Sequence, residues 1–114
     1  MNSIFKKPWG HYKVLQKGKK YLIKNIFVKP GGKLSLQSHR HRSEHWIVVK
    51  GIAKVTIDKK IATLKTNQSI FIPRLSKHRL ENTHKMGLNI IEVQYGNILS
   101  EKDIIRYEDI YERI

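Results

Sequence analysis

Four polar side chains of this chain have the types and the spacing of a metal site. Gln37 and His39 are separated by one residue, and Glu44 follows them closely. His78 lies farther along, five residues after Pro73. Imidazole, amide and carboxylate groups form a metal centre when they converge from separate strands on one point. We therefore predict that one divalent ion is bound by Gln37, His39, Glu44 and His78, with positions open for water or substrate.

The first of these side chains lie on a stretch that alternates like a β-strand. Residues 33–41 read KLSLQSHRH, with leucines on one face and mostly polar groups on the other. Because residues i and i+2 share a face of a strand, Gln37, His39 and His41 are expected to point the same way. His41 is then a candidate to contact the ion's surroundings or the substrate.

The remaining β-type runs are short and are separated by turn residues. They cover residues 21–29, 44–49, 53–57, 61–64, 69–72 and 88–95. Many short strands spaced by turns are typical of a β-sandwich or barrel. In residues 98–114, isoleucines and tyrosines recur at helical spacing, which predicts a short, partly helical segment packed on the outside of the barrel. We expect one domain spanning residues 1–114.

The charge is strongly positive and unevenly distributed. Lys and Arg total 23 against 9 Asp and Glu, for a net charge of +14 at pH 7. Five of the nine acids lie in residues 100–114, and the body keeps only Glu44, Asp58, Glu81 and Glu92. A basic body suits a polyanion or a phosphorylated small molecule, although lysines solvated on strand faces explain it equally well. No nucleic-acid motif accompanies the charge, so a nucleic-acid partner is not expected.

The composition also excludes several classes of protein. The chain has no cysteine, which excludes thiolate metal sites, disulfide frameworks and cysteine nucleophiles. No apolar run approaches the roughly 18 residues that a membrane span requires, and the N-terminus lacks the apolar core of a signal peptide. We expect a cytoplasmic protein with no membrane partner.

Two spaced motifs resemble those of the cupins. The first motif comprises Gly31, Gln37, His39, Glu44 and Gly51, and the second comprises Asn67, Pro73, Leu75, His78 and Asn82. Gln37 replaces a usual His, while Asn67 and Leu75 stand where the family usually has Gly. The resemblance implies an all-β cupin fold, that is, a double-stranded β-helix or jelly-roll barrel.

Nearly the whole chain resembles a narrower family, the type II mannose-6-phosphate isomerases. Shared blocks include Pro8-Trp9-Gly10, Leu34-Ser35-Leu36-Gln37, Glu44-His45-Trp46, Leu80-Glu81-Asn82 and Ile91-Glu92-Val93-Gln94. In many members this cupin is the C-terminal part of a bifunctional enzyme that also contains a mannose-1-phosphate guanylyltransferase. The present sequence has no room for that domain, so the resemblance implies the isomerase part as a stand-alone chain. A Gln, His, Glu and His ligand set is also that of phosphomannose isomerases generally, which implies zinc.

The resemblance implies a metal-dependent isomerase that interconverts mannose 6-phosphate and fructose 6-phosphate. The ion would stabilise negative charge on the sugar oxygens, and a protein base would move a proton between C1 and C2. The candidate bases are Glu81, Glu92 and His41, and the candidate substrate-binding residues are Lys24, Arg106 and Gln94. The alternative is a non-catalytic or differently specific cupin that binds a sugar phosphate or a nucleotide sugar. Since cupins commonly pair through sheets or terminal strands, a homodimer is expected.

Overall fold

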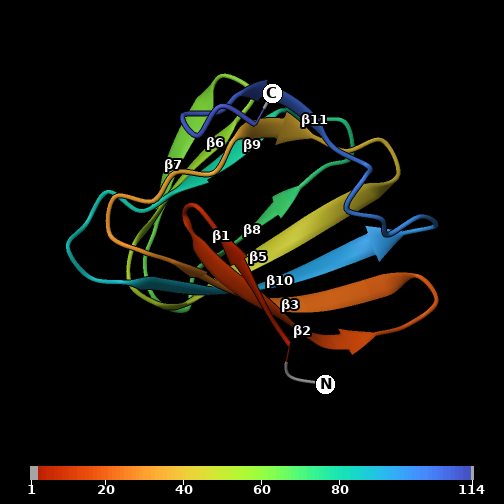
Figure 1. The fold of residues 1–114 in the computed structure, drawn as a ribbon, viewed down its shortest axis with the longest axis horizontal. Helices are drawn as coiled ribbons and strands as arrows, with labels where there is room; N and C mark the ends of the chain where they lie inside the picture. Colours follow the sequence, from red (N-terminus) through yellow and green to blue (C-terminus); the bar gives the residue numbers. More distant parts are fainter. Residues whose placement is uncertain (1–2, 114) are drawn as a thin grey trace.

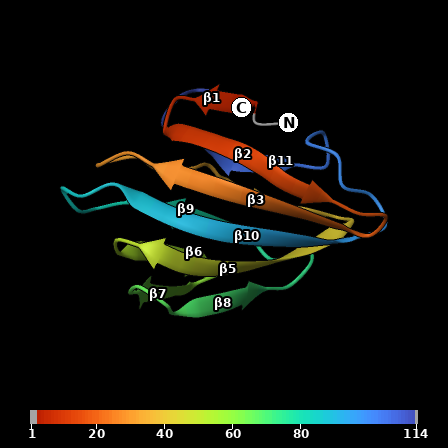
Figure 2. The same ribbon diagram turned by 90° about the horizontal axis from the view of Figure 1, so that it is seen from below.

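The computed structural model describes residues 3–113, and every regular element in this range is a β-strand (Figure 1). The six-stranded sheet has the order β1 (Ile4–Lys7), β2 (Gly10–Lys17), β3 (Tyr21–Val28), β10 (Leu88–Gly96), β5 (Arg42–Lys50) and β8 (Ser69–Ile72). The five-stranded sheet has the order β11 (Ile105–Glu108), β4 (Leu36–Ser38), β9 (His78–Glu81), β6 (Ala53–Ile57) and β7 (Lys60–Leu64). The two sheets form two layers with the core between them (Figure 1), and Figure 2 shows the six-stranded sheet in front of the other. The expected all-β fold is confirmed, and no helix in the described range is long and apolar enough to cross a membrane.

One end of the barrel interior is apolar. Strands β3, β5 and β10 alternate between buried and more exposed side chains, as the period of a strand requires. The antiparallel register places Leu88 opposite Val28, and Ile90 opposite Val48. These four side chains are almost completely buried and belong to the main apolar cluster of the protein. Their burial is the main source of stability for this end of the barrel.

The same strands carry polar side chains into the other end of the interior. Along β10 the inward positions change from apolar residues to Glu92 and then Gln94. Glu92 lies opposite Lys24 on one side and opposite Trp46 on the other, while Gln94 lies opposite Glu44. Burying such groups is unfavourable unless they are paired or functional, so this polar end is where a site is expected.

The C-terminal segment is not helical, and the prediction of a partly helical segment is wrong. Residues 98–113, which we call the C-terminal strap, contain strand β11 flanked by turns and irregular structure. Strand β11 pairs with β4, with Ile105 opposite Ser38 and Arg106 opposite Gln37. This pairing uses an edge strand that would otherwise be open, and it outweighs the helical spacing of the apolar residues. Ile114, the last residue of that pattern, lies outside the described residues.

Two turns explain where the chain departs from the cupin motifs. Asn67 and Leu75, which stand at positions where the family usually has Gly, have φ angles of 71° and 76°. Such left-handed conformations are readily adopted by Gly, are tolerated by Asn and are unfavourable for Leu. Leu75 nevertheless helps to place the site, because its backbone N–H donates to the carbonyl of His39 at 2.9 Å.

Candidate metal centre and cavity

His39, Glu44 and His78 converge at the polar end of the barrel. All three side chains are buried, and one candidate ligand atom from each lies within 4.8 Å of the others. Nε2 of His39 is 3.3 Å from Oε2 of Glu44, and Nε2 of His78 is 3.7 Å from Oε1 of the same carboxylate. Three of the four predicted ligands therefore form a group that could hold a metal ion.

The Nδ1 atom of each histidine, which points away from Glu44, is held by a backbone carbonyl. His39 Nδ1 is 2.6 Å from the carbonyl oxygen of Asp103, and His78 Nδ1 is 3.0 Å from that of Ser76. Because a carbonyl only accepts, each Nδ1 must carry the proton, and each Nε2 presents a lone pair. His78 Nε2 is buried and has no hydrogen-bond partner among the described residues. An orphaned acceptor beside a carboxylate and a second imidazole fits a metal ligand set.

Burial also keeps these imidazoles neutral. It lowers the pKa of His39 to about 4, with a further contribution from the nearby Arg42 guanidinium. Burial likewise lowers the pKa of His78. Since only the neutral imidazole binds a metal, both groups remain competent ligands below the usual pKa of histidine.

The expectation that polar residues of 33–41 share a face holds only as far as His39. Gln37 lines the same cavity as His39 and Glu44, and it lies opposite His78 in the pairing of β4 with β9. The chain then bends at residues 40 and 41, and the side chain of His41 is exposed and outside this cavity. The alternation of a strand cannot extend through a bend, which is why the structure does not bring His41 to the site.

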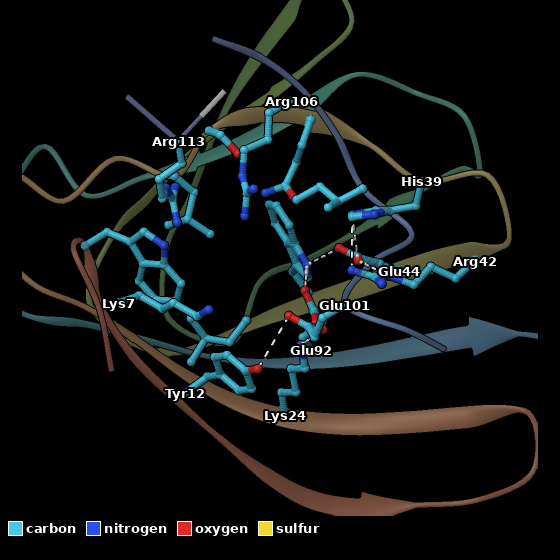
Figure 3. A pocket seen from close by; sticks show the side chains of 17 residues that line it. Lys7, Tyr12, Lys24, His39, Arg42, Glu44, Glu92, Glu101, Arg106 and Arg113 are labelled. Atoms are coloured by element: carbon cyan, nitrogen blue, oxygen red, sulfur yellow. Dashed lines mark hydrogen bonds and ion pairs between the residues drawn. The ribbon is translucent and has the colours of Figure 1, made fainter. Parts of the chain in front are cut away.

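The cavity at this end contains about 560 Å³ of space, part of it open to solvent (Figure 3). The charged side chains that line it are Lys7, Lys24, Arg42, Arg106, Arg113, Glu44, Glu92 and Glu101. In Figure 3, Lys7 and Arg113 lie on the side away from His39 and Arg42. The cavity therefore combines a possible metal centre at one side with cations at the other.

Glu92 is the one candidate base that lines this cavity. Its Oε2 accepts the indole N–H of Trp46 at 2.9 Å, and its Oε1 accepts from Nε2 of Gln94 at 2.8 Å. Burial, with a further contribution from the negative charge of Glu44, raises the pKa of Glu92 to about 7. Gln94 is buried behind Glu92 and is not part of the cavity lining, so it orients Glu92 instead of facing a ligand.

Glu81 lies on the other face of β9 from His78. It is opposite Lys54 in the pairing of β9 with β6, and its Oε1 is 3.9 Å from Nζ of that lysine. It does not line the cavity. The three-residue separation from His78 explains this placement, since an odd spacing along a strand puts two side chains on opposite faces.

Lys24 and Arg106, the two cations predicted to bind the substrate, differ in whether another side chain already pairs with them. Lys24 is buried, and its Nζ is 2.7 Å from Oε2 of Glu101 and 4.1 Å from the centre of the Tyr12 ring. Arg106 has a buried Nε without a hydrogen-bond partner. Within residues 3–113, no ion pair engages Arg106 or Lys7. These two cations are therefore the ones available to an anionic ligand.

Sequence reasoning did not single out Arg42 and Glu101. Arg42 is buried, and it donates from Nε to Oε2 of Glu44 at 2.8 Å and approaches Nε2 of His39 at 3.2 Å with Nη2. Its position two residues before Glu44 on a strand was a usable signal, because the two must share a face. Glu101 lies in irregular structure of the C-terminal strap, where no periodicity indicates that it faces the cavity.

Two facing antiparallel sheets with a polar cavity at one end are the arrangement of the cupin fold, which solved structures of cupins share. A cupin of the RmlC-like class from Shewanella frigidimarina matches with a TM-score of 0.76 over 89% of this chain and 87% of that chain, at 20% identity. Oxalate decarboxylase from Bacillus subtilis matches with a TM-score of 0.82 over 92% of this chain and 30% of that chain, at 17% identity. Likenesses at such low identity concern the fold alone.

The sequence places the chain in a particular family of cupins. A family model described as "Mannose-6-phosphate isomerase C-terminal" matches residues 1–109, so the chain belongs to this family. It is 53% identical over 107 residues to the alginate biosynthesis protein AlgA of Pseudomonas putida and 50% identical over 108 residues to a mannose-1-phosphate guanylyltransferase of Escherichia coli. The alignments cover 94% and 95% of this chain but only 22% and 23% of these relatives. The chain thus spans less than a quarter of the length of the curated relatives that it matches.

Proposed function

We propose that this chain is a metal-dependent aldose–ketose isomerase that interconverts mannose 6-phosphate and fructose 6-phosphate. The observation that carries the proposal is the meeting of His39, Glu44 and His78 at the edge of a cavity, where His39 and Glu44 line the wall together with a second buried carboxylate, Glu92. His78 is buried behind this wall and is not part of the lining. Membership of the mannose-6-phosphate isomerase C-terminal family supports it. A site of this kind has the two parts that the reaction needs, an electrophile and a base.

The proposed ion is zinc, held by His39, Glu44 and His78 with Gln37 as a fourth ligand. Nitrogen and carboxylate donors suit zinc, and both Nε2 atoms face the carboxylate. When bound, the ion would supply Lewis-acid stabilisation of the negative charge that develops on the sugar oxygens at C1 and C2. The ligand residues would also orient the sugar, because their side of the cavity fixes where the reacting carbons must lie.

Glu92 is the proposed base. It takes the proton from one of the two reacting carbons and returns it to the other, while the hydroxyl proton passes between the oxygens on C1 and C2, so the sugar gains and loses no net proton. One carboxylate therefore suffices for the transfer between carbons in both directions. Hydrogen bonds from Trp46 and Gln94 hold it toward the cavity with a fixed orientation. Such pre-orientation lowers the barrier, because the carboxylate does not have to be positioned at the moment of proton transfer.

The cations across the cavity are proposed to bind the phosphate. Arg106 and Lys7 line the cavity without a carboxylate partner among the described residues. Arg106 presents the planar guanidinium donors that recognise phosphate oxygens well. A sugar phosphate can therefore span the cavity, with its reacting carbons near His39 and its phosphate near Arg106 and Lys7. Lys24 can join them if the phosphate replaces Glu101 as its partner.

A second candidate function is binding of a sugar phosphate without turnover. Arg42 donates to Glu44 and lies within hydrogen-bond distance of His39, so two of the ligand side chains are engaged without an ion. These hydrogen bonds satisfy the buried carboxylate and imidazole, so the cavity does not need an ion for its stability. The relatives also carry this domain as a small part of much longer chains, which leaves room for a role other than catalysis.

The two functions are separated by an assay with the metal-reconstituted protein. Turnover of mannose 6-phosphate is followed by coupling the fructose 6-phosphate that is formed to a second enzyme, and a panel of other sugar phosphates is run in parallel. The isomerase proposal expects turnover that requires the ion and is abolished by a chelator. Binding of a sugar phosphate by calorimetry, with no turnover of any member of the panel, would instead establish the second function.

A further inference from the structure

One residue of the C-terminal strap, Asp103, contacts His39 and the two residues that follow it. The carbonyl oxygen of Asp103 is 2.6 Å from Nδ1 of His39. Its two carboxylate oxygens accept the backbone N–H groups of Arg40 at 3.0 Å and His41 at 2.9 Å. Asp103 therefore accepts three hydrogen bonds from three consecutive residues at the bend after β4.

Further contacts tie the same strap to the other side of the site. Arg106 of β11 pairs with Gln37 of β4, so the strand that bears this proposed ligand and ends directly before His39 is bonded to the strap. The carbonyl of Ser100 accepts from Nη1 of Arg42 at 3.2 Å. The hydroxyls of Ser38 and Tyr107 lie 2.9 Å apart. Segments that are distant in the sequence thus form one hydrogen-bonded unit around the site.

Charge explains why the strap binds where it does. It carries five of the nine acids of a chain whose net charge is +14. Glu101 pairs with Lys24 at 2.7 Å, and Glu108 pairs with Arg79 at 3.2 Å. Each of these two ion pairs contributes little stability, because Glu101 and Glu108 are exposed. Together they hold the acidic strap at one position on the basic body.

We propose that Asp103 is a positioning residue for the metal centre, fixing the tautomer and the orientation of His39 through its carbonyl and holding the 39–41 bend through its carboxylate. The inference rests on the metal-binding part of the proposed function. A carbonyl that accepts the Nδ1 proton of a histidine ligand leaves Nε2 as the nitrogen that faces the metal. The two carboxylate bonds keep that carbonyl in place, because Asp103 cannot shift along the bend without breaking them.

A purely structural role for Asp103 makes a different prediction. The strap also covers apolar residues, since Tyr111 packs against the main apolar cluster. If Asp103 served only to attach the strap, its loss would lower the stability of the protein and leave the affinity of the folded protein for an ion unchanged. Metal affinity measured well below the unfolding temperature therefore separates positioning from attachment.

The test is a zinc titration of the full chain, with a chromophoric chelator as competitor, for the wild type, Asp103→Ala, Asp103→Asn and Glu112→Gln. Glu112 is exposed and lies in the same strap, so its variant controls for the loss of one negative charge. We expect Asp103→Ala to lose about 10–100-fold in affinity, the usual scale for disturbing a partner of a metal ligand, because the carbonyl that orients His39 is kept but is no longer held in place by the carboxylate. Asp103→Asn keeps one acceptor oxygen and should lose less, and Glu112→Gln should match the wild type.

Nitrogen-15 NMR of the metal-free protein gives a second readout. The wild type should show His39 with the proton on Nδ1, and Asp103→Ala should show a mixture of tautomers. Wild-type zinc affinity in a folded Asp103→Ala or Asp103→Asn variant would overturn the inference, and the Asn variant decides the matter if the Ala variant does not fold. If the wild type binds zinc but shows no turnover, the isomerase proposal fails and this inference stands. If the wild type binds no zinc, both fail.

Discussion

Trp46 joins Glu44 and Glu92 through one indole N–H. Its Nε1 lies 2.9 Å from Oε2 of Glu92 and 3.2 Å from Oε1 of Glu44. The two carboxylates come from neighbouring strands, β10 and β5, and Trp46 is buried beside them. A single donor shared by a proposed ligand and a proposed base keeps both acids in fixed positions, and it leaves their mutual repulsion only partly compensated.

This pair gives the metal-free protein a defined pH dependence. Burial and the charge of Glu44 raise the pKa of Glu92 from 4.5 to about 7, so folding penalises the ionised form. The wild type therefore has this part of its stability in full below pH 4.5, where Glu92 is protonated in both the folded and the unfolded chain. It loses that part as the pH rises through about 7 and the buried carboxyl ionises. Glu92→Gln removes this penalty, and its stability relative to the wild type should increase by roughly 3 kcal/mol across that interval.

The measurement is urea unfolding of both proteins at several pH values, with a chelator present. Comparing the two proteins at each pH cancels the titration of His39 and His78, whose lowered pKa values act in the opposite direction. Glu81→Gln is the matched control, because Glu81 is outside the cavity. A difference between Glu92→Gln and the wild type that does not change with pH would contradict the burial of an ionisable Glu92.

Removal of His78 should release most of the bound ion. His78 Nε2 is a buried acceptor with no partner among the described residues, and Ala at this position leaves the proposed ion with an open shell. Elemental analysis after dialysis should show low occupancy in His78→Ala and wild-type occupancy in His84→Ala, whose side chain is exposed in a loop. Full occupancy in His78→Ala would remove this residue from the ligand set.

The sequence was sufficient to predict the barrel and the group of proposed ligands. Turn spacing and strand alternation are local properties, and two motifs in the right order identified His39, Glu44 and His78 as members of one site. The same alternation rule also applies to Arg42 and Glu44 and could have placed Arg42 in the cavity. The guanidinium of Arg42 is not a metal-ligand group, so a pattern of metal ligands does not point to it.

Other features could not be predicted, for physical reasons. His41 leaves the site because the strand ends at a bend that no local pattern indicates. Glu101 and Asp103 reach the site because the C-terminal strap pairs with an edge strand more than sixty positions earlier in the chain. Pairings between distant segments depend on the whole fold, so the helical spacing of the strap was a misleading local signal.

The left-handed conformation of Leu75 predicts a stabilising substitution. This conformation is unfavourable by about 1–2 kcal/mol for a residue with a Cβ. Leu75 is 60% exposed, so little apolar burial is lost when the side chain is removed. Leu75→Gly should therefore raise the free energy of unfolding by about 0.5–1 kcal/mol after the greater freedom of Gly in the unfolded chain is subtracted. Leu75→Ala keeps the Cβ and should show no gain in chemical denaturation, which makes it the control.

A homodimer remains a prediction, and the outer face of the six-stranded sheet is the surface we propose for it. Phe71 packs on His45 there, with ring centres 4.7 Å apart, and the exposed apolar residues nearby include Ile47, Val49 and Tyr95. Phe71→Glu should convert a dimer into a monomer in light scattering. Met86→Glu, which places the same charge on an exposed loop residue, should not. A monomeric wild type at assay concentrations would rule out the dimer.

The last prediction concerns the base. Glu92→Gln keeps the shape of the side chain and can still hydrogen-bond through its amide, but it cannot accept the proton from carbon. It should lose roughly 100-fold or more in kcat, the usual scale for a general base, while KM changes little and the bound zinc is retained. Glu81→Gln should behave as the wild type, because Glu81 pairs with Lys54 on the outer side of β9.

Zinc content is measured on the same samples, so that a loss of metal is not mistaken for a loss of the base. If Glu92→Gln retains zinc and turns over normally, Glu92 is not the base. Glu101 would then be the next candidate, since it lines the cavity, and its ion pair with Lys24 would have to open for it to reach the sugar. That alternative predicts a pH profile set by the release of Glu101 from Lys24, and Glu101→Gln would then carry the loss in kcat.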